Sequence, residues 1–260
     1  MKVATIKELK TKLENITEIN DPFIEEIKKD TRKGVQTLFK TWQKKKEKEE
    51  ELHQRFLALN TYENQLRTKG YTLIAGIDEV GRGPLAGPVV TAAVILPENF
   101  YLPGIDDSKK LSEKKREEFF ESIQQEAIAI GIGIIHAEEI DQINIYEATK
   151  KAMLQAINDL TINPDYLLID AMKLTTPYPS QSIIKGDSKS ITIAAASIIA
   201  KVTRDNMMKE LDKQFPAYHF KKNMGYGTKE HLEALQIEGI TSYHRKSFSP
   251  VKEMSLTRKK

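Results

Sequence analysis

The chain of 260 residues contains no cysteine and a single tryptophan, and none of its apolar runs approaches the length of a membrane span. Without cysteine, disulfide bonds, thiolate metal sites and cysteine nucleophiles are excluded, so any metal must be held by oxygen or histidine ligands. The polar, helix-forming N-terminus also lacks the pattern of a cleavable secretion signal. These absences predict a cytoplasmic protein that makes no contact with a membrane.

A strong excess of one charge is absent as well. The formal net charge is +3, which is too small to indicate a nucleic-acid partner by itself. The distribution is uneven, because residues 1–70 contain 16 Lys and Arg against 12 Asp and Glu, and residues 71–260 contain 24 against 25. The positive excess therefore lies in the N-terminal part of the chain.

That N-terminal part has helical spacing. Leucine, isoleucine and aromatic residues recur three or four positions apart over residues 5–16 and 30–66, which predicts a helical extension spanning residues 1–70. Asn20-Asp21-Pro22 interrupts it, and Thr68-Lys69-Gly70 separates it from the rest of the chain. No internal repeat is present.

Within this extension, Leu38, Phe39 and Trp42 share a helical face. That arrangement favours packing against the body of the protein over stacking on nucleic-acid bases. The lysines at 44–46 and 48 lead into the glutamates at 49–51. Such mixed charge is typical of a solvated helix face, and contact with phosphate is the alternative.

After residue 70 the pattern becomes one of alternating strands and helices. Strands are predicted over residues 73–80, 89–96, 129–135, 166–170 and 182–185. Helices are predicted over residues 112–125, 137–160 and 190–209, and the second of these is open to division into two pieces. The fold class is therefore α/β, a mixed sheet flanked by helices, in a domain of residues 71–260 that includes a C-terminal helical segment.

The most informative segment is the end of the first of these strands. Asp78 and Glu79 leave a buried apolar run and enter the turn Gly81-Arg82-Gly83. A carboxylate in such a place is costly unless it is paired, protonated or bound to a cation. The glycines allow the backbone to approach a ligand, and the guanidinium of Arg82 can grip a phosphate. The segment is typical of a metal-dependent phosphodiester site, and a strand end with Asp78 paired to a lysine is the alternative.

Two further carboxylates occupy similar settings. Asp170 ends the apolar strand at 166–170, and Asp187 lies in a turn just before the helix that begins at Ser190. If the strands of Asp78 and Asp170 are neighbours, the acids converge at one edge of the sheet and suit a hard cation such as Mg²⁺ or Mn²⁺. Two such ions roughly 4 Å apart promote in-line displacement at phosphorus. The alternatives are a helix cap for Asp170 and an ordinary turn residue for Asp187.

Several segments together closely resemble bacterial ribonuclease HII over about residues 71–250. The resemblance rests on five segments: Asp78 to Val89, Asp107 to Leu111, Lys185 to Asp187, Ala194 to Asp205, and Gly225 to Thr228. It implies a ribonuclease H-like fold and a four-carboxylate site that binds Mn²⁺ or Mg²⁺. The catalytic and metal-binding residues matched in this way are Asp78, Glu79, Asp170 and Asp187.

The resemblance also implies the substrate. The family cuts the RNA strand of RNA/DNA hybrids, and it cuts on the 5′ side of a single ribonucleotide in duplex DNA, as ribonucleotide excision repair requires. Its glycine-arginine-glycine turn, matched by Gly81, Arg82 and Gly83, contacts the ribonucleotide 2′-hydroxyl, and its tyrosine, matched by Tyr226, packs on the following sugar. A buried core aromatic is the alternative for Tyr226.

Other residues are assigned more coarsely. The candidates for positioning phosphate are Lys109, Lys110, Lys185, Lys189 and Arg204, each with a solvated surface charge as the alternative. His136, His219, His231 and His244 have no metal-ligand spacing and are expected to be structural. A monomer is expected.

Two observations bear on the choice of family and function. Arg82 and the helical extension favour ribonuclease HII over the sister family ribonuclease HIII, and the extension is expected to strengthen duplex binding or to support folding. The alternatives in function are a phosphotransferase, whose phosphate-binding and dinucleotide-binding glycine motifs are missing, and a catalytically inactive hybrid-binding module.

Overall fold

The computed structural model describes residues 4–16 and 21–257. These residues form two units, which divide between Arg55 and Phe56. The division falls earlier than the predicted boundary at residue 70. Phe56 at the end of helix α3 (Lys33–Leu59) packs in the core of the larger unit, and Leu66 of α4 (Thr61–Arg67) packs there as well.

The smaller unit contains α1 (Ile6–Glu14), α2 (Pro22–Lys29) and the first part of α3. Thr5 forms a capping box with Glu8, and Asp21 caps the helix that the sequence analysis missed, with Pro22 in its first turn. The three helices bury their apolar faces against one another. The core consists of Leu9, Leu13, Ile16, Ile24, Ile27, Val35, Phe39 and Trp42.

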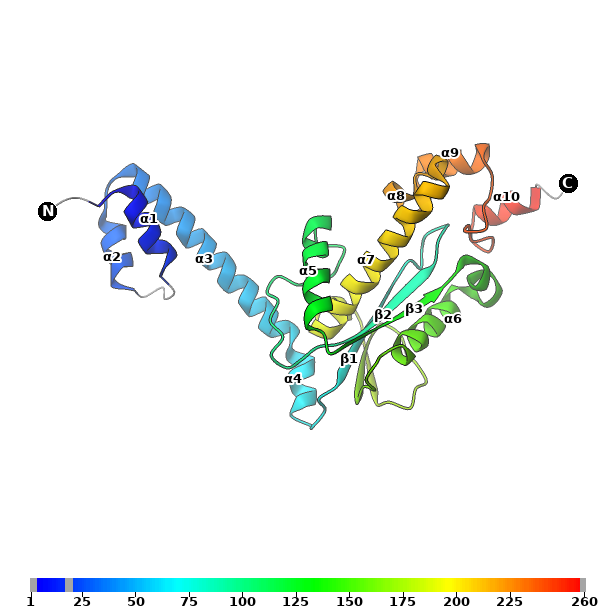
Figure 1. Cartoon of the computed structure of the whole chain (residues 1–260), viewed down its shortest axis with the longest axis horizontal. Coiled ribbons are helices and arrows are strands. Elements are labelled where there is room, and N and C mark those ends of the chain that lie inside the picture. The colour runs from blue at the N-terminus through cyan, green and yellow to red at the C-terminus, as the bar shows by residue number, and fades with distance from the viewer. Residues whose placement is uncertain (1–3, 17–20, 258–260) are drawn as a thin grey trace. The chain divides into compact units, whose positions relative to one another are not determined.

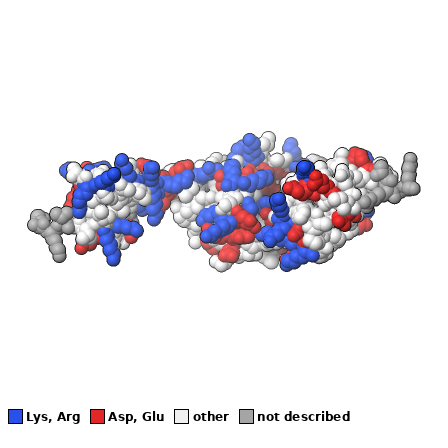
Figure 2. Space-filling model, turned by 90° about the horizontal axis from the view of Figure 1, so that it is seen from above, with Lys and Arg blue, Asp and Glu red and all other residues white. Residues whose placement is uncertain are grey.

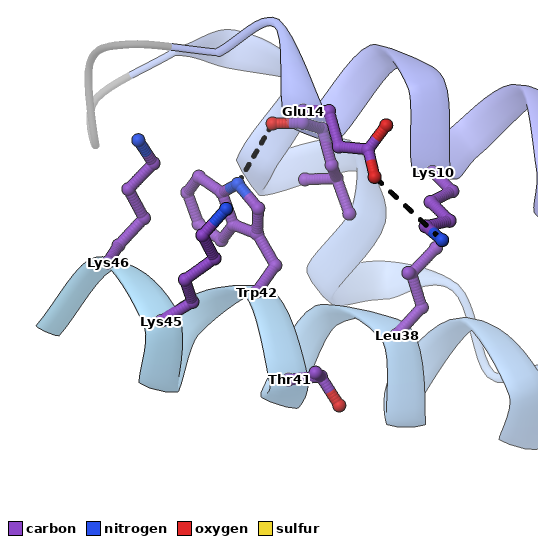
Figure 3. A pocket seen from close by; sticks show the side chains of 8 residues that line it. Lys10, Glu14, Leu38, Thr41, Trp42, Lys45 and Lys46 are labelled. Atoms are coloured by element: carbon purple, nitrogen blue, oxygen red, sulfur yellow. Dashed lines mark hydrogen bonds and ion pairs between the residues drawn. The ribbon is translucent and has the colours of Figure 1, made fainter. Parts of the chain in front are cut away.

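Trp42 belongs to this core, so the prediction that its face packs against the body of the protein is wrong. Its indole Nε1 donates a hydrogen bond to the carbonyl oxygen of Leu13 over 2.9 Å (Figure 3). Lys10, Lys45 and Lys46 line the shallow pocket beside it. The apolar face of α3 is therefore used within the helical unit.

The charged run on α3 is a solvated face, as predicted. Lys45 and Lys46 pair with Glu49, and Lys48 pairs with Glu51, all within the same helix. Figure 2 shows basic and acidic side chains interspersed over the visible face of the molecule. Phosphate contact by these lysines stays an untested alternative.

The larger unit is built on a five-stranded sheet with strand order β3-β2-β1-β4-β5. Strands β1 (Ile74–Val80), β2 (Val89–Ile95) and β3 (Ala129–Ile135) are antiparallel, whereas β4 (Tyr166–Asp170) and β5 (Ser180–Ile183) run parallel to β1. The last strand ends earlier than predicted, because Lys185 adopts a left-handed conformation with φ of 56°. The predicted mixed sheet is confirmed.

Helices cover both faces of this sheet (Figure 1). On one face, α7 (Ile191–Gln214) and α5 (Glu113–Glu126, capped by Ser112 as predicted) pack against Ala92 and Val94, and on the other α6 (Ala137–Asn158) packs against Ala93 and Ile95. The alternation along β2 produces these two apolar layers. Helix α6 is divided at Asn144, whose φ of 65° is not helical.

The N-terminal end of α7 approaches β1 very closely. A Cβ atom on Gly76 would lie 2.1 Å from the backbone carbon of Thr192, so only glycine fits at this position. Ala194, Ala195 and Ala196 are fully buried, which confirms that the small residues of α7 allow it to lie close to the sheet. This contact places the beginning of α7 against Gly76, two residues before Asp78 in β1.

The C-terminal helical segment is also present. It comprises α8 (Phe220–Asn223), α9 (Lys229–Ile237) and α10 (Val251–Thr257), which bury apolar residues together with Leu85 and Met208. Along the described parts of the chain, no helix combines the length and apolarity needed to cross a membrane.

Candidate active site

Asp78 and Asp170 lie side by side on neighbouring strands, Asp170 as the last residue of β4 and Asp78 two residues before the end of β1. Strands β1 and β4 are parallel, and Ile77 is opposite Ile169, so the next residue of each strand is an aspartate. Both isoleucines face the α6 layer, and the alternation of side chains therefore directs the two aspartates toward the α7 face. The condition stated for convergence of these acids, that their strands are neighbours, is therefore met.

Asp187 joins them through a short connection. It lies in a 3₁₀ turn (Gly186–Ser188) between β5 and α7, and the backbone N–H of Gly186 donates to Oδ1 of Asp170 over 2.7 Å. The hydroxyl of Ser190 caps α7 and fixes where the helix begins. This hydrogen bond ties the turn that carries Asp187 to Asp170, so Asp187 lies close to the other acids.

The carboxylates oppose one another's ionisation. Burial raises the pKa of Asp78 well above its ordinary value, and the charges of Glu79 and Asp170 raise it further, although a hydrogen bond from Ser197 acts in the opposite direction. Burial also raises the pKa of Asp170 and of Asp187. Groups that repel one another in this way favour a bound cation, which stabilises the ionised forms.

A further carboxylate, which the sequence analysis did not assign to the site, belongs to this neighbourhood. The charge of Asp107 contributes to the raised pKa values of both Asp170 and Asp187. Its chain neighbour Ser108 hydrogen-bonds Ser197 of α7, with 2.9 Å between the hydroxyl oxygens, and Ser197 in turn hydrogen-bonds Asp78. The sequence offered one signal, since Asp107 begins one of the family segments.

Glu79 completes the four predicted carboxylates. Its Oε2 is buried and has no hydrogen-bond partner, while Oε1 accepts from Arg82 Nη1 over 3.3 Å. Burial raises the pKa of Glu79 despite the Arg82 guanidinium. An orphaned, buried carboxylate oxygen among other acids is a fitting ligand for a divalent cation.

The carboxylates do not form a complete, preformed metal-coordination site. Among the residues that the structure describes, no three His, Asp or Glu side chains stand in a metal-holding arrangement. The donor set nonetheless fits a hard cation, because it consists of carboxylate oxygens of raised pKa and one of them is unpartnered.

The predicted lysines have different surroundings. Burial alone would lower the pKa of Lys109, but the charges of Asp107, Asp78 and Asp187 raise it, so this ammonium group lies among the acids. Lys110 is paired with Asp106 over 3.1 Å, and Lys189 donates to the carbonyl oxygen of Ile184 over 2.9 Å. Lys185 is exposed. Their contact with phosphate stays a prediction.

The two predicted substrate-reading elements are adjacent. A Cβ atom on Gly83 would lie 3.6 Å from Cε1 of Tyr226, so the ring and the turn face the same space. Tyr226 is 47% exposed, which makes the alternative of a buried core aromatic wrong. Arg82 is also exposed.

The prediction that Arg204 contacts phosphate is wrong. Its side chain is fully buried and donates to the carbonyl oxygens of Pro88, Ala86 and Met224 at 2.9 to 3.1 Å. A guanidinium held in this way has no donor facing a substrate. It instead fixes the loop that follows the glycine-arginine-glycine turn.

Comparison with known structures identifies the fold. The ribonuclease H2 of Pyrococcus horikoshii OT3 shares 25% identity and a TM-score of 0.63, covering 72% of this chain and 99% of that one. A structure of Bst-RNase HIII in complex with Mn²⁺ has 16% identity and a TM-score of 0.57, over 73% of this chain and 71% of that one, and shows the fold alone. Fold and carboxylates together define a metal-dependent nuclease of the ribonuclease H-like class.

Sequence comparison narrows the class. The family model Ribonuclease HII matches residues 75–251, and the model Ribonuclease HII N-terminal domain matches residues 5–67. A Ribonuclease HII of Bacillus cereus is 60% identical over 254 residues, covering 98% of this chain and 99% of that one, and Ribonuclease HII of Bacillus thuringiensis (strain Al Hakam) is 61% identical with the same coverage. The chain belongs to the ribonuclease HII family and is a metal-dependent endoribonuclease that acts on RNA/DNA hybrids.

Proposed function

We propose that Asp78, Glu79, Asp170 and Asp187 bind Mn²⁺ or Mg²⁺, and that the enzyme cuts both the RNA strand of hybrids and duplex DNA on the 5′ side of a single ribonucleotide. The observation that carries this proposal is the adjacency of Asp78 and Asp170 beside the unpartnered Oε2 of Glu79. A phosphotransferase is not favoured, because the family is one of nucleases.

In the proposed reaction, a water molecule gives up a proton and its oxygen bonds to phosphorus while the bond from phosphorus to the 3′ oxygen breaks. The leaving oxygen takes up a proton and becomes a 3′-hydroxyl, and the ribonucleotide keeps a 5′-phosphate. Divalent cations, when bound, activate the water and neutralise charge at the leaving oxygen. The carboxylates hold these cations, and Lys109, which lies among them, attracts the phosphate.

The substrate is read by the turn and the tyrosine. Gly81, Arg82 and Gly83 offer backbone and guanidinium groups to the 2′-hydroxyl and the adjoining phosphate, and the exposed ring of Tyr226 packs on the next sugar. A ring at that position favours a deoxyribose, which lacks the 2′-hydroxyl. We further assign the enzyme to the cytoplasm, as a monomer, in the removal of ribonucleotides from DNA.

The test is cleavage of a DNA duplex that carries one ribonucleotide, labelled on the ribonucleotide-containing strand, in Mn²⁺, in Mg²⁺ and in chelator. A single metal-dependent cut on the 5′ side of the ribonucleotide is expected. Cleavage of a hybrid without the junction cut would refute the selectivity for embedded ribonucleotides. Binding of both substrates without any cleavage would leave the inactive hybrid-binding module.

A further inference from the structure

Two consecutive residues of the C-terminal segment, His244 and Arg245, reach the two substrate-reading elements from inside the protein. Both side chains are buried, with exposed fractions of 1% and 0%. Their hydrogen bonds lead in two directions, one toward the glycine-arginine-glycine turn and the other toward Tyr226.

Arg245 holds the turn by its backbone carbonyl groups. Its Nη2 donates to the oxygens of Gly81 and Gly87 at 2.6 and 2.8 Å, Nη1 donates to Arg82 at 2.9 Å, and Nε donates to Gly87 at 3.0 Å. All four bonds go to this loop. Burial lowers the pKa of Arg245 to about 9, so the side chain remains a cation at neutral pH. No shorter or neutral side chain can supply the same fork of donors.

His244 holds Tyr226 through a second histidine. Nδ1 of His244 is 3.1 Å from the backbone nitrogen of Thr241, which can only donate, so the proton of a neutral His244 is on Nε2. That nitrogen lies 3.0 Å from Nε2 of His231, whose Nδ1 in turn lies 2.8 Å from the carbonyl oxygen of Tyr226. A carbonyl oxygen can only accept, so a single arrangement of protons satisfies the whole chain.

Burial keeps both imidazoles neutral. It lowers the pKa of His231, and together with the neighbouring His231 it lowers the pKa of His244 to about 4. These two histidines were expected to be structural, and their hydrogen bonds show what they support, which is the backbone of Tyr226.

We propose that His244 and Arg245 are positioning residues for substrate selection, which together hold the glycine-arginine-glycine turn and Tyr226 at a fixed separation. This inference rests on the proposed function, since the separation matters only if the turn reads a 2′-hydroxyl and Tyr226 reads the next sugar. Loss of alignment of the order of 1 Å is enough to impair such reading. A junction needs both readers in register, whereas the following sugar of a long hybrid carries the hydroxyl that the ring disfavours.

The experiment compares the full-length variants R245K and H244F with V251A. Val251 is buried in the same C-terminal cluster and its valine side chain has no hydrogen-bonding group, so V251A serves as a destabilised control that removes no hydrogen bond to either reader. For the single-ribonucleotide duplex, KM is expected to rise about tenfold in R245K and H244F with kcat changed less. The ratio of kcat/KM for this duplex to that for a hybrid should fall in both variants, remain unchanged in V251A, and recover in part in H244Q, which restores a donor.

A purely structural role would lower the thermal midpoint of all variants and leave the ratio as in the wild type, and that result would overturn the proposal. Hydrogen exchange separates this failure from failure of the proposed function. R245K and H244F are each expected to raise exchange in both peptides, residues 81–87 and 224–228. If the wild type cleaves neither substrate, the proposed function is refuted. If hydrogen exchange rises only in the peptide that contacts the substituted residue, the two readers are not coupled and the positioning role is refuted.

Discussion

The backbone N–H of Gly186 lies 2.7 Å from Oδ1 of Asp170, and this hydrogen bond joins the end of a central strand to the turn that carries Asp187. Two acids that are 17 positions apart in the sequence are thereby held together. The same turn is also fixed to the start of α7, because the backbone N–H of Ser190 donates to the carbonyl oxygen of Gly186 over 2.8 Å. The position of Asp187 therefore depends on how closely Gly186 can approach its neighbours.

Substituting Gly186 by alanine tests this dependence. The added Cβ would lie 2.5 Å from Cδ1 of Ile193 and 3.3 Å from Oδ1 of Asp170, so either the turn or the buried side chain of Ile193 must move, and we expect the turn to move. We expect kcat to fall by about 10 to 100-fold, since small misplacements of catalytic groups have effects of that order. Shortening the obstructing side chain in the double variant G186A/I193V should recover part of the activity. Activity of G186A equal to that of the wild type would contradict the account.

Asp78→Asn should abolish cleavage while preserving hybrid binding, because it removes a charged ligand and leaves the turn and the lysines in place. A loss of at least about 10³-fold in kcat is expected when a cation ligand of this kind is removed. In chelator D78N should be more stable than the wild type, because the substitution removes a buried charge that the charges of Glu79 and Asp170 oppose. Each kcal/mol gained in the free energy of unfolding should raise the thermal midpoint by about 2 to 4 °C. Activity near that of the wild type would refute the assignment of Asp78.

The ends of β1 and β4 show why part of the site could be predicted. An apolar run that ends in an acid is a local pattern, and it was sufficient to place Asp78 and Asp170. Asp187 was singled out by its turn before the helix at Ser190, and motif matching then assigned it to the site. Tyr226 came from motif matching alone, which transfers knowledge of the family without any geometry. The structure adds the geometry by showing which of these residues face one another.

The failures have a shared physical cause. Nothing local distinguishes a buried arginine from one that contacts phosphate, and the partners of Arg204 are carbonyl groups 116 and 118 positions away. Arg245 was missed for the same reason, because it acts on Gly81 across 164 positions. Trp42 was assigned the wrong partner since an apolar helical face does not specify what covers it. Long-range contacts of this kind are absent from composition and periodicity.

The free energy of unfolding of the enzyme should decrease as the pH is lowered, because the histidine pair becomes protonated. The pKa of His244 is lowered in the folded state from 6.5 to about 4, so the unfolded state binds more protons between these values. The corresponding stability is complete above pH 6.5 and is lost as the pH falls toward 4. Thermal midpoints measured from about pH 7 to about pH 4.5 should decline less steeply in H244Q than in the wild type. Parallel curves would show that the pair does not contribute.

Two truncations should separate the roles of the N-terminal helices. Glu63 of α4 is fully buried, and its Oε1 accepts from the hydroxyls of Ser190 and Thr192 at 2.6 and 2.8 Å. Deleting residues 1–55 retains this contact and should leave the thermal midpoint of the larger unit within a few degrees. Deleting residues 1–66 removes it and should destabilise the start of α7, with E63A as the matched full-length variant and an expected cost of about 1 to 3 kcal/mol.

The same pair of truncations tests whether the extension strengthens duplex binding. The shorter deletion should weaken affinity for a ribonucleotide-containing duplex at low salt, since it removes most of the positive excess of residues 1–70. Equal affinity of the truncated and full-length proteins would leave support of folding as the function of the extension. Because E63A retains the whole extension, it should bind the duplex as the wild type does under conditions where it is folded.

Tyr226 provides the most direct separation of recognition from folding. Its ring is 47% exposed, so Tyr226→Ala should lower the thermal midpoint little, whereas a buried aromatic would cost about 3 to 5 kcal/mol. Cleavage at a single ribonucleotide should fall by about 10 to 100-fold, in keeping with the loss of about 1 to 3 kcal/mol from a stacking contact. Tyr226→Phe keeps the ring and should keep most of the activity. A large loss of stability in Y226A, with unchanged kcat/KM on the folded fraction, would show that the ring supports the fold and does not read the sugar.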